Sequence, residues 1–306
     1  MNSAPATTAT IPWWAKGVPF ILSGVLFLSG VFTLFSPLPI LMLAFQSGRA
    51  WAWAAAFTNL ALVAFAGGGP SAALYAIFVM ALALSLPEFL KRKIRVENSA
   101  LLSMGTMAVV GLLVVASLAY ANRVNPVAHL RQELSSWVDF LLSSISPEAK
   151  ETWLRGEDAG DWKNQLLSEV PSGIGIFALI LVWANTFIVL RLNPQKLRES
   201  LNLEFSYFRT WKAPEYLLWP TIIASVFMIF AHGKLEIWGT NFFKFFMAIY
   251  AIQGLSILSF VFDVWKFRGL VRSVAYLLVV FLMLPLVLGV GFFDLWFDFR
   301  AKLRQS

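Results

Sequence analysis

The sequence predicts an all-α protein that crosses a membrane several times. Of its 306 residues, 58% are hydrophobic and only 13% carry a charge, and its mean hydropathy is +0.71. An α-helix of about 20 apolar residues covers the ~30 Å hydrocarbon core of a bilayer. Nearly uncharged apolar stretches close to that length recur along the chain, at residues 18–35, 99–121, 173–190, 216–231, 245–262 and 273–293.

The region 37–86 decides how many transmembrane helices the sequence predicts. Residues 37–46 are apolar but only about half a span long. Two short apolar stretches follow, 50–66 and 71–86, separated by the run from Gly67 to Pro70. Counting three passes here gives about nine helices in all. If residues 37–46 form a re-entrant segment instead, the count is eight.

Charge in the loops predicts the orientation. Loops 87–98, 191–215 and 263–272 each hold two more basic than acidic residues, whereas 122–171 holds three more acidic than basic ones. Since cytoplasmic loops are enriched in Lys and Arg, the three basic loops should face the cytoplasm. The N-terminus is then cytoplasmic and 122–171 external. Each crossing reverses the side of the membrane, so one crossing after the cytoplasmic loop 263–272 places the C-terminal tail outside despite its cations. The alternative is a tail that lies flat on the membrane interface.

Three parts of the chain follow from this reading. Residues 1–16 form a disordered cytoplasmic tail. Residues 17–192 form a six-helix membrane portion that includes the external insert 122–171. Residues 193–306 form a three-helix membrane portion that ends in an amphipathic tail.

The external insert carries apolar residues at helical spacing, with polar residues on the other face. The apolar stripe consists of Leu130, Leu134, Trp137, Val138, Leu141, Leu142 and Ile145. A second short helix is expected from Ser146 to Gly156 and a third from Asp161 to Glu169. The insert is either a lid over the bundle or an interfacial connector between two spans, and the connector is the commoner arrangement.

Composition excludes several functions. The chain has no cysteine, and its two histidines, His129 and His232, lie in separate loops, so no metal site is expected. Neither a phosphate-binding lysine loop nor a hydrolase or metalloprotease motif is present. We therefore expect no cofactor and no enzymatic activity. The net charge of +7 resides in short loops and does not indicate nucleic-acid binding.

Three amides lie within the predicted spans, at Asn59, Asn185 and Gln253. An unsatisfied amide in lipid costs several kcal/mol, so each should face the interior of the bundle. They either bind a solute or form hydrogen bonds between helices, and the second role is favoured for each one singly. None is ionised, which argues against a proton relay.

The C-terminus reads GFFDLWFDFR. In a helix, Asp294 and Asp298 would share one side at i and i+4, with Trp296 on the apolar side. Arg300 is expected to pair with Asp298. The two carboxylates could act as an acid/base pair or bind a cation. An amphipathic end to the last span is the favoured alternative.

The C-terminal third resembles the YybS-like family of bacterial multi-pass membrane proteins of unknown function. The residues that carry this resemblance are Trp211, Pro214, Asn241, Gln253, Gly254, Asp294, Trp296, Asp298, Phe299 and Arg300. That family is similar to the substrate-binding S subunits of energy-coupling-factor transporters, which have six helices and an outward-facing solute site. No residue matches a vitamin-binding motif, so no ligand is implied.

The resemblance implies a solute-binding or uptake component of the bacterial inner membrane. Such a protein has no ATPase of its own and depends on membrane protein partners, in addition to the bilayer and a small-molecule solute. The alternative is a non-catalytic membrane scaffold or assembly factor for an envelope complex.

Overall fold

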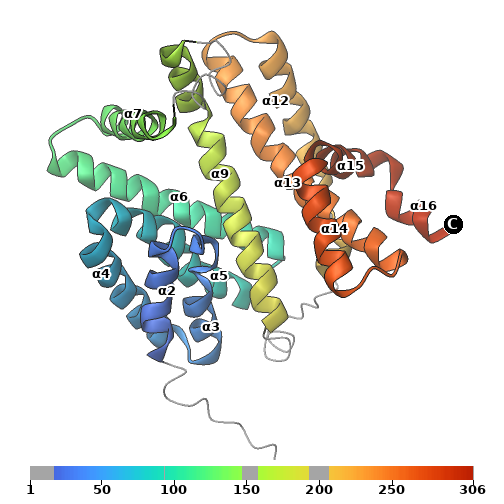
Figure 1. The fold of residues 1–306 in the computed structure, drawn as a ribbon, viewed down its shortest axis with the longest axis horizontal. Helices are drawn as coiled ribbons and strands as arrows, with labels where there is room; N and C mark the ends of the chain where they lie inside the picture. The colour runs from blue at the N-terminus through green and yellow to red at the C-terminus, as the bar shows by residue number, and fades with distance from the viewer. Residues whose placement is uncertain (1–16, 93, 147–157, 193–206, 306) are drawn as a thin grey trace, which may run out of the picture. The chain divides into compact units, whose positions relative to one another are not determined.

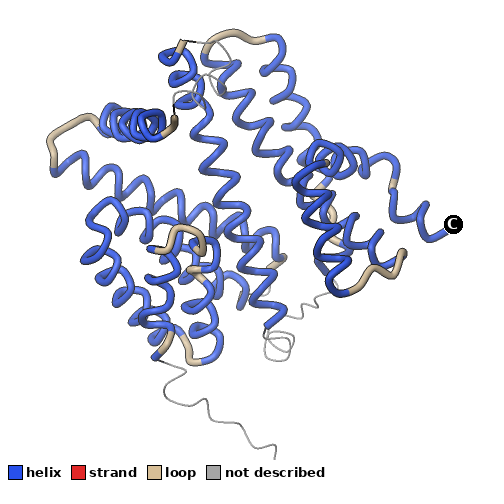
Figure 2. The backbone as a smooth tube through the Cα atoms, viewed as in Figure 1, coloured by secondary structure: helices blue, strands red, loops and turns tan. Residues whose placement is uncertain are grey.

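A computed structural model describes residues 17–92, 94–146, 158–192 and 207–305, and all regular structure within them is helical. The chain divides into two compact units. The first comprises residues 1–117 and 180–203, and the second comprises 118–179 and 204–306. Figure 1 traces the helices along the chain, and Figure 2 separates them from the loops. The all-α class is confirmed for the described residues.

Four described helical runs are long and apolar enough to cross a membrane: Arg49–Lys91, Val96–Ala121, Gly160–Leu192 and Lys234–Val264. A fifth crossing is added if the bent pair Gly269–Leu282 and Leu284–Phe297 counts as one span. Three shorter apolar helices remain, Pro19–Leu28, Thr33–Gln46 and Glu215–Phe230. The chain is therefore a membrane protein with several apolar helices, whereas the number of nine transmembrane helices stays a prediction.

The first unit begins with two short helices, where a span over 18–35 and a pass or re-entrant segment over 37–46 were predicted. Helix α2 (Pro19–Leu28) ends ahead of Gly30, whose φ of +70° is a left-handed conformation that favours glycine. A 3-10 turn, η1 (Thr33–Phe35), leads into α3 (Leu38–Gln46). Each helix is only about 15 Å long, so the prediction of one continuous span over 18–35 is wrong.

Next in this unit is a helical run with a sharp turn inside it. It consists of α4 (Arg49–Leu74), the π-helix η2 (Tyr75–Met80) and α5 (Ala81–Lys91). Gly68 has non-helical angles (φ 77°, ψ −178°), and Pro70 follows it. Residues of α4 contact residues of α5, which a straight helix would hold too far apart, so the chain folds back at Gly68. The predicted turn at Gly67–Pro70 is confirmed.

Two long helices follow in the chain. Helix α6 spans Val96–Ala121, and α9 spans Ala159–Leu192. Residues 161–169 belong to α9, so the separate third helix expected there is wrong. Pro171 lies within α9.

Between them, α7 (Pro126–Ser144) confirms the predicted amphipathic helix. Asn125 caps it, because its Oδ1 accepts hydrogen bonds from the amides of Val127 and Ala128. Within the apolar stripe, Val138 and Leu142 are buried. The second short helix, expected over 146–156, falls almost entirely outside the described residues.

The last part of the second unit contains the remaining helices: α11 (Tyr207–Thr210), η3 (Glu215–Leu217), α12 (Leu218–Phe230), α13 (Lys234–Val264), α14 (Gly269–Leu282), α15 (Leu284–Phe297) and α16 (Phe299–Gln305). Helix α13 is central, because α11, α12, α15 and α16 all pack against it. Helices α14 and α15 meet at Met283 with a bend of 93°. The prediction of a single straight span over 273–293 is therefore wrong.

Two glycines allow α13 and α15 to approach closely. A methyl group on Gly254 would overlap the carbonyl oxygen of Val287, and one on Gly291 would overlap that of Tyr250. Beside this crossing, the ring of Tyr250 meets the ring of Phe292 edge to face at 5.1 Å. The close approach brings the polar residues on these two helices into contact.

Candidate functional site

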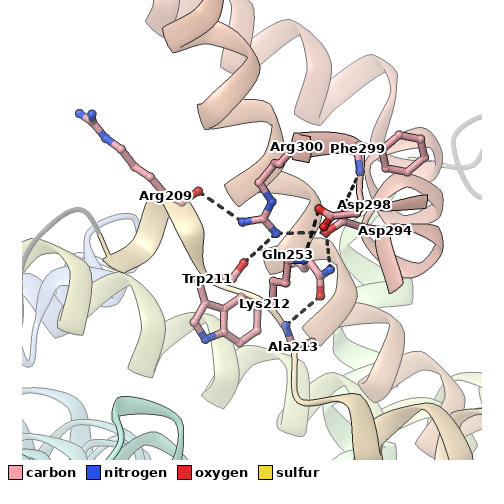
Figure 3. Close-up of polar contacts among 9 residues, drawn as sticks. All are labelled: Arg209, Trp211, Lys212, Ala213, Gln253, Asp294, Asp298, Phe299 and Arg300. Carbon is pink, nitrogen blue, oxygen red and sulfur yellow. Dashed lines mark hydrogen bonds and ion pairs between the residues drawn. The ribbon is translucent and has the colours of Figure 1, made fainter. Parts of the chain in front are cut away.

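A buried polar cluster lies where α13, α15 and α16 meet the non-helical segment that precedes η3. In Figure 3 the side chains of Gln253, Asp294 and Arg300 point toward one another. Their relative exposures are 0%, 2% and 5%. Charged residues are almost never buried this deeply unless they are paired. The cluster is therefore the strongest candidate site in the described chain.

Asp294 is the acceptor at the centre of this cluster. Its Oδ2 accepts hydrogen bonds from Gln253 Nε2 at 2.9 Å and from Arg300 Nη2 at 3.1 Å. Its Oδ1 accepts from the backbone N–H of Phe299 at 2.9 Å. Arg300 and Asp294 thus neutralise each other away from water, as a buried ion pair requires.

The cluster also satisfies backbone groups of the segment 209–213. Arg300 Nη2 donates to the carbonyl oxygen of Trp211 at 3.1 Å, and Nη1 donates to that of Arg209 at 3.5 Å. Gln253 Oε1 accepts from the N–H of Ala213 at 2.8 Å. Residues 211–214 are not helical, so they lack the usual intrahelical partners. In a membrane, non-helical backbone is tolerated only where protein groups satisfy it in this way.

Half-exposed ion pairs surround the buried cluster. Lys212 Nζ lies 3.3 Å from Asp298 Oδ1, and Arg209 Nη1 lies 3.3 Å from Asp263 Oδ2. Asp263 also binds Arg272, which donates to Ser259 Oγ at 2.8 Å. The short loop 263–272 and the segment 209–213 are thereby linked at the C-terminal end of α13.

The structure corrects the predicted C-terminal arrangement. Helix α15 ends at Phe297, and Asp298 adopts a left-handed conformation with φ 39°. Asp294 and Asp298 therefore do not share a helical face, and Arg300 pairs with Asp294 rather than with Asp298. Trp296 is about half exposed and packs against the ring of Phe292 at 5.3 Å.

Asn59 and Asn185, in the first unit, use their amides on the backbone. Asn59 Oδ1 accepts from Gly24 N–H at 2.7 Å, while its Nδ2 donates to the carbonyls of Pro19 and Ala55. Asn185 Nδ2 donates to the carbonyls of Leu34 and Leu181, and its buried Oδ1 has no hydrogen-bond partner. Since Gln253 lies in the second unit, the three amides do not converge within one unit.

Replacing Asn59 by leucine is expected to lower the free energy of unfolding by about 2–3 kcal/mol. The change removes the three hydrogen bonds of the Asn59 side chain, two of which join α4 to the backbone of α2 at Gly24 and Pro19. Unfolding of the purified protein in detergent measures this loss. The neighbouring change Thr58→Ala is the control, because Thr58 is exposed and bonds only to Ala54 within its own helix. Equal stability of the two variants would contradict the role assigned to Asn59.

Asn241 is a positioning residue that hydropathy does not reveal. Its Oδ1 accepts from Ser172 N–H and its Nδ2 donates to Ser168 carbonyl, both at 2.8 Å. These are the two groups that would bond to each other in an uninterrupted helix, and they lie beside Pro171. Asn241 therefore joins α13 to the turn of α9 that contains Pro171. The proline just before the apolar stretch 173–190 was the available signal.

A surface groove of about 500 Å³ lies between α7 and the start of α9. Arg131, Gln132, Lys163 and Asn164 are among its lining residues. Lys163 is already paired with Asp139 at 2.6 Å. Among the described residues, no group of three or more His, Asp or Glu could hold a metal ion.

Long apolar helices, together with a charge pair buried between helices, define an α-helical integral membrane protein. The chain belongs to the predicted membrane protein family DUF2232, whose model matches residues 18–295. Comparison with curated proteins and with solved structures found no match. The narrower similarity to YybS-like proteins and to transporter S subunits stays a prediction.

Proposed function

We propose that the protein is a non-enzymatic solute-binding or uptake component of the bacterial inner membrane. The observation that carries the proposal is the buried Asp294–Arg300 pair beside the non-helical segment 211–214 and the end of α15 at Phe297. In many transporters, solutes bind where membrane helices are discontinuous, because the freed backbone and nearby polar groups can act as ligands. Ionisable side chains buried away from water inside a membrane protein are costly, so they are often kept for function.

Two atoms of the second unit support a polar ligand at this place. Arg300 Nε and Ser256 Oγ are buried and have no hydrogen-bond partner. Buried polar atoms are nearly always satisfied, so such exceptions call for a water, an ion or a solute. Ser256 lies one helical turn beyond Gln253 on α13. A solute with polar groups could bond to these atoms without displacing the backbone contacts of the cluster.

The proposed orientation follows the basic loops. Loops 87–98, 191–215 and 263–272 face the cytoplasm together with the N-terminus, and the segment 122–171 faces outward. Energy for uptake would come from separate membrane protein partners, as in the S subunits that the chain resembles. Hydropathy predicts nine crossings, and eight if the bent pair α14 and α15 does not cross the membrane.

A membrane scaffold is the second candidate, and one observation favours it. The amides of Asn59 and Gln253 and both nitrogens of the Arg300 fork are used within the protein, largely on backbone groups. Residues whose only role is to hold helices together would use their polar groups in this way. The two candidates differ in whether a small molecule binds.

Mass spectrometry of small molecules that copurify with the detergent-solubilised protein tests the proposal. We expect a bound compound in the wild type and at least a tenfold lower occupancy in Ser256→Ala, because that change removes an unpartnered buried hydroxyl without breaking a protein hydrogen bond. The matched control is Ser225→Ala, which lies on an exposed part of α12. Copurification of a stoichiometric membrane protein without any small molecule would support the scaffold instead.

A further inference from the structure

We propose that α14 and α15 form a re-entrant pair, so that the C-terminal tail returns to the side of the membrane from which α14 enters. That side also holds the loop 263–272 and the segment 209–213. This inference is independent of solute binding, because it concerns only the path of the chain.

Helix length is the first observation. Helices α14 and α15 have 14 residues each, which makes each about 21 Å long and shorter than the ~30 Å hydrocarbon core. Their 93° bend at Met283 prevents them from adding up to one straight span. Two short helices joined by a sharp bend either cross the membrane obliquely or enter and leave on one side. The contacts of the tail distinguish these paths.

The tail contacts the segment that leads into α12. Arg300 donates to the carbonyls of Trp211 and Arg209, and Asp298 pairs with Lys212. Helix α16 also packs against α13. Figure 3 shows these contacts converging from the C-terminal helix and from the segment 209–213.

The contacted segment is tied to one end of α13. Arg209 pairs with Asp263, next to the C-terminal end of that helix, and Asp263 binds Arg272 at the start of α14. With 31 residues, α13 is about 46 Å long, so its two ends lie on opposite sides of a bilayer. The opposite end begins after His232 and Gly233. The tail is therefore linked to the end that carries Asp263.

Charge agrees with this placement. The tail contains Arg300, Lys302 and Arg304, and cations near transmembrane ends favour the cytoplasm. A straight last span puts these three cations outside, which conflicts with the rule that orients the other basic loops. A re-entrant pair removes the conflict, because it leaves the tail and loop 263–272 on one side. Arg300 acts as a positioning residue that holds the tail against the segment 209–213.

Labelling of single cysteines tests the path, and the chain is suited to it because it has no cysteine of its own. Three exposed positions are changed one at a time: Ala301→Cys in α16, Arg268→Cys in the loop before α14, and His232→Cys before α13. Each variant in whole cells is treated with a membrane-impermeant maleimide before and after permeabilisation. The full-length protein is then analysed for modification.

We expect Ala301→Cys to react like Arg268→Cys and opposite to His232→Cys. In the predicted orientation, only His232→Cys is modified in intact cells, and the other two gain at least tenfold labelling after permeabilisation. If Ala301→Cys instead reacts together with His232→Cys, or reacts from both sides, the re-entrant path is wrong. An inverted protein would reverse all three results while leaving the comparison valid. The labelling experiment needs no solute, so its result can contradict the re-entrant path while the proposed function still stands.

Discussion

Replacing Asp294 by alanine is expected to lower the free energy of unfolding by about 3–5 kcal/mol, the largest effect of any single change considered. The substitution leaves the guanidinium of Arg300 buried without a counter-charge, and breaking one partner of a buried pair has this cost. It also removes the acceptors for Gln253 Nε2 and for the N–H of Phe299. Denaturant unfolding in detergent, with the yield of monodisperse protein, measures the loss.

Two further variants make this prediction specific. Asp298→Asn is the matched control, because the pair between Asp298 and Lys212 is half exposed and worth at most about 1 kcal/mol. Asparagine also tolerates the left-handed conformation at this position. The double variant Asp294→Leu with Arg300→Met should recover part of the loss, since no charge is left buried. If Asp294→Ala is as stable as Asp298→Asn, the ion pair is not buried as the structure places it.

Replacing Gly254 by leucine is expected to prevent α13 and α15 from packing as they do. The atoms that a side chain would meet include the backbone carbonyl of Val287, which cannot rotate away as a flexible side chain could. Overpacking of a well-filled interior typically costs 1–3 kcal/mol, and the backbone contact puts this change at roughly the upper end or beyond. Gly291→Leu should behave in the same way, because its side chain would meet the backbone of Tyr250.

The control for this prediction lies on α15, two residues before Gly291. Gly289 has no atom within 4 Å of the position that a Cβ would occupy, so Gly289→Leu should change stability by less than about 0.5 kcal/mol. Thermal unfolding in detergent, together with size-exclusion chromatography, compares the three variants. Comparable losses in Gly254→Leu and Gly289→Leu would show that the close crossing is not needed for packing.

The sequence predicted the parts of the fold that depend on local chemistry. The turn at Gly67–Pro70 was predictable because glycine permits the backbone angles seen at Gly68 and proline interrupts helical hydrogen bonding. The helix α7 was predictable from the spacing of its apolar residues. Hydropathy could not locate the breaks after Leu28 and at Met283. The reason is that apolar residues are equally compatible with one long helix or two short ones.

The candidate site was predicted only in part. Gln253, Asp294 and Arg300 were singled out as unusual polar residues, and all three are buried in one cluster. The predicted partner of Arg300 was wrong, because it assumed that the last helix continues through Asp298. Ala213 and Gln253 are 40 positions apart in the sequence, and Trp211 and Arg300 are 89 positions apart. No local pattern encodes such pairs.

The amino-acid sequence by itself determined that this is a helical membrane protein with basic loops, because hydropathy and charge act on each segment separately. Only the tertiary structure decided where helices break and which polar groups pair. At residues 211–214 the non-helical backbone, and at Asp294 and Arg300 the buried charges, need partners from other elements. Those partners exist only once the chain has packed around α13.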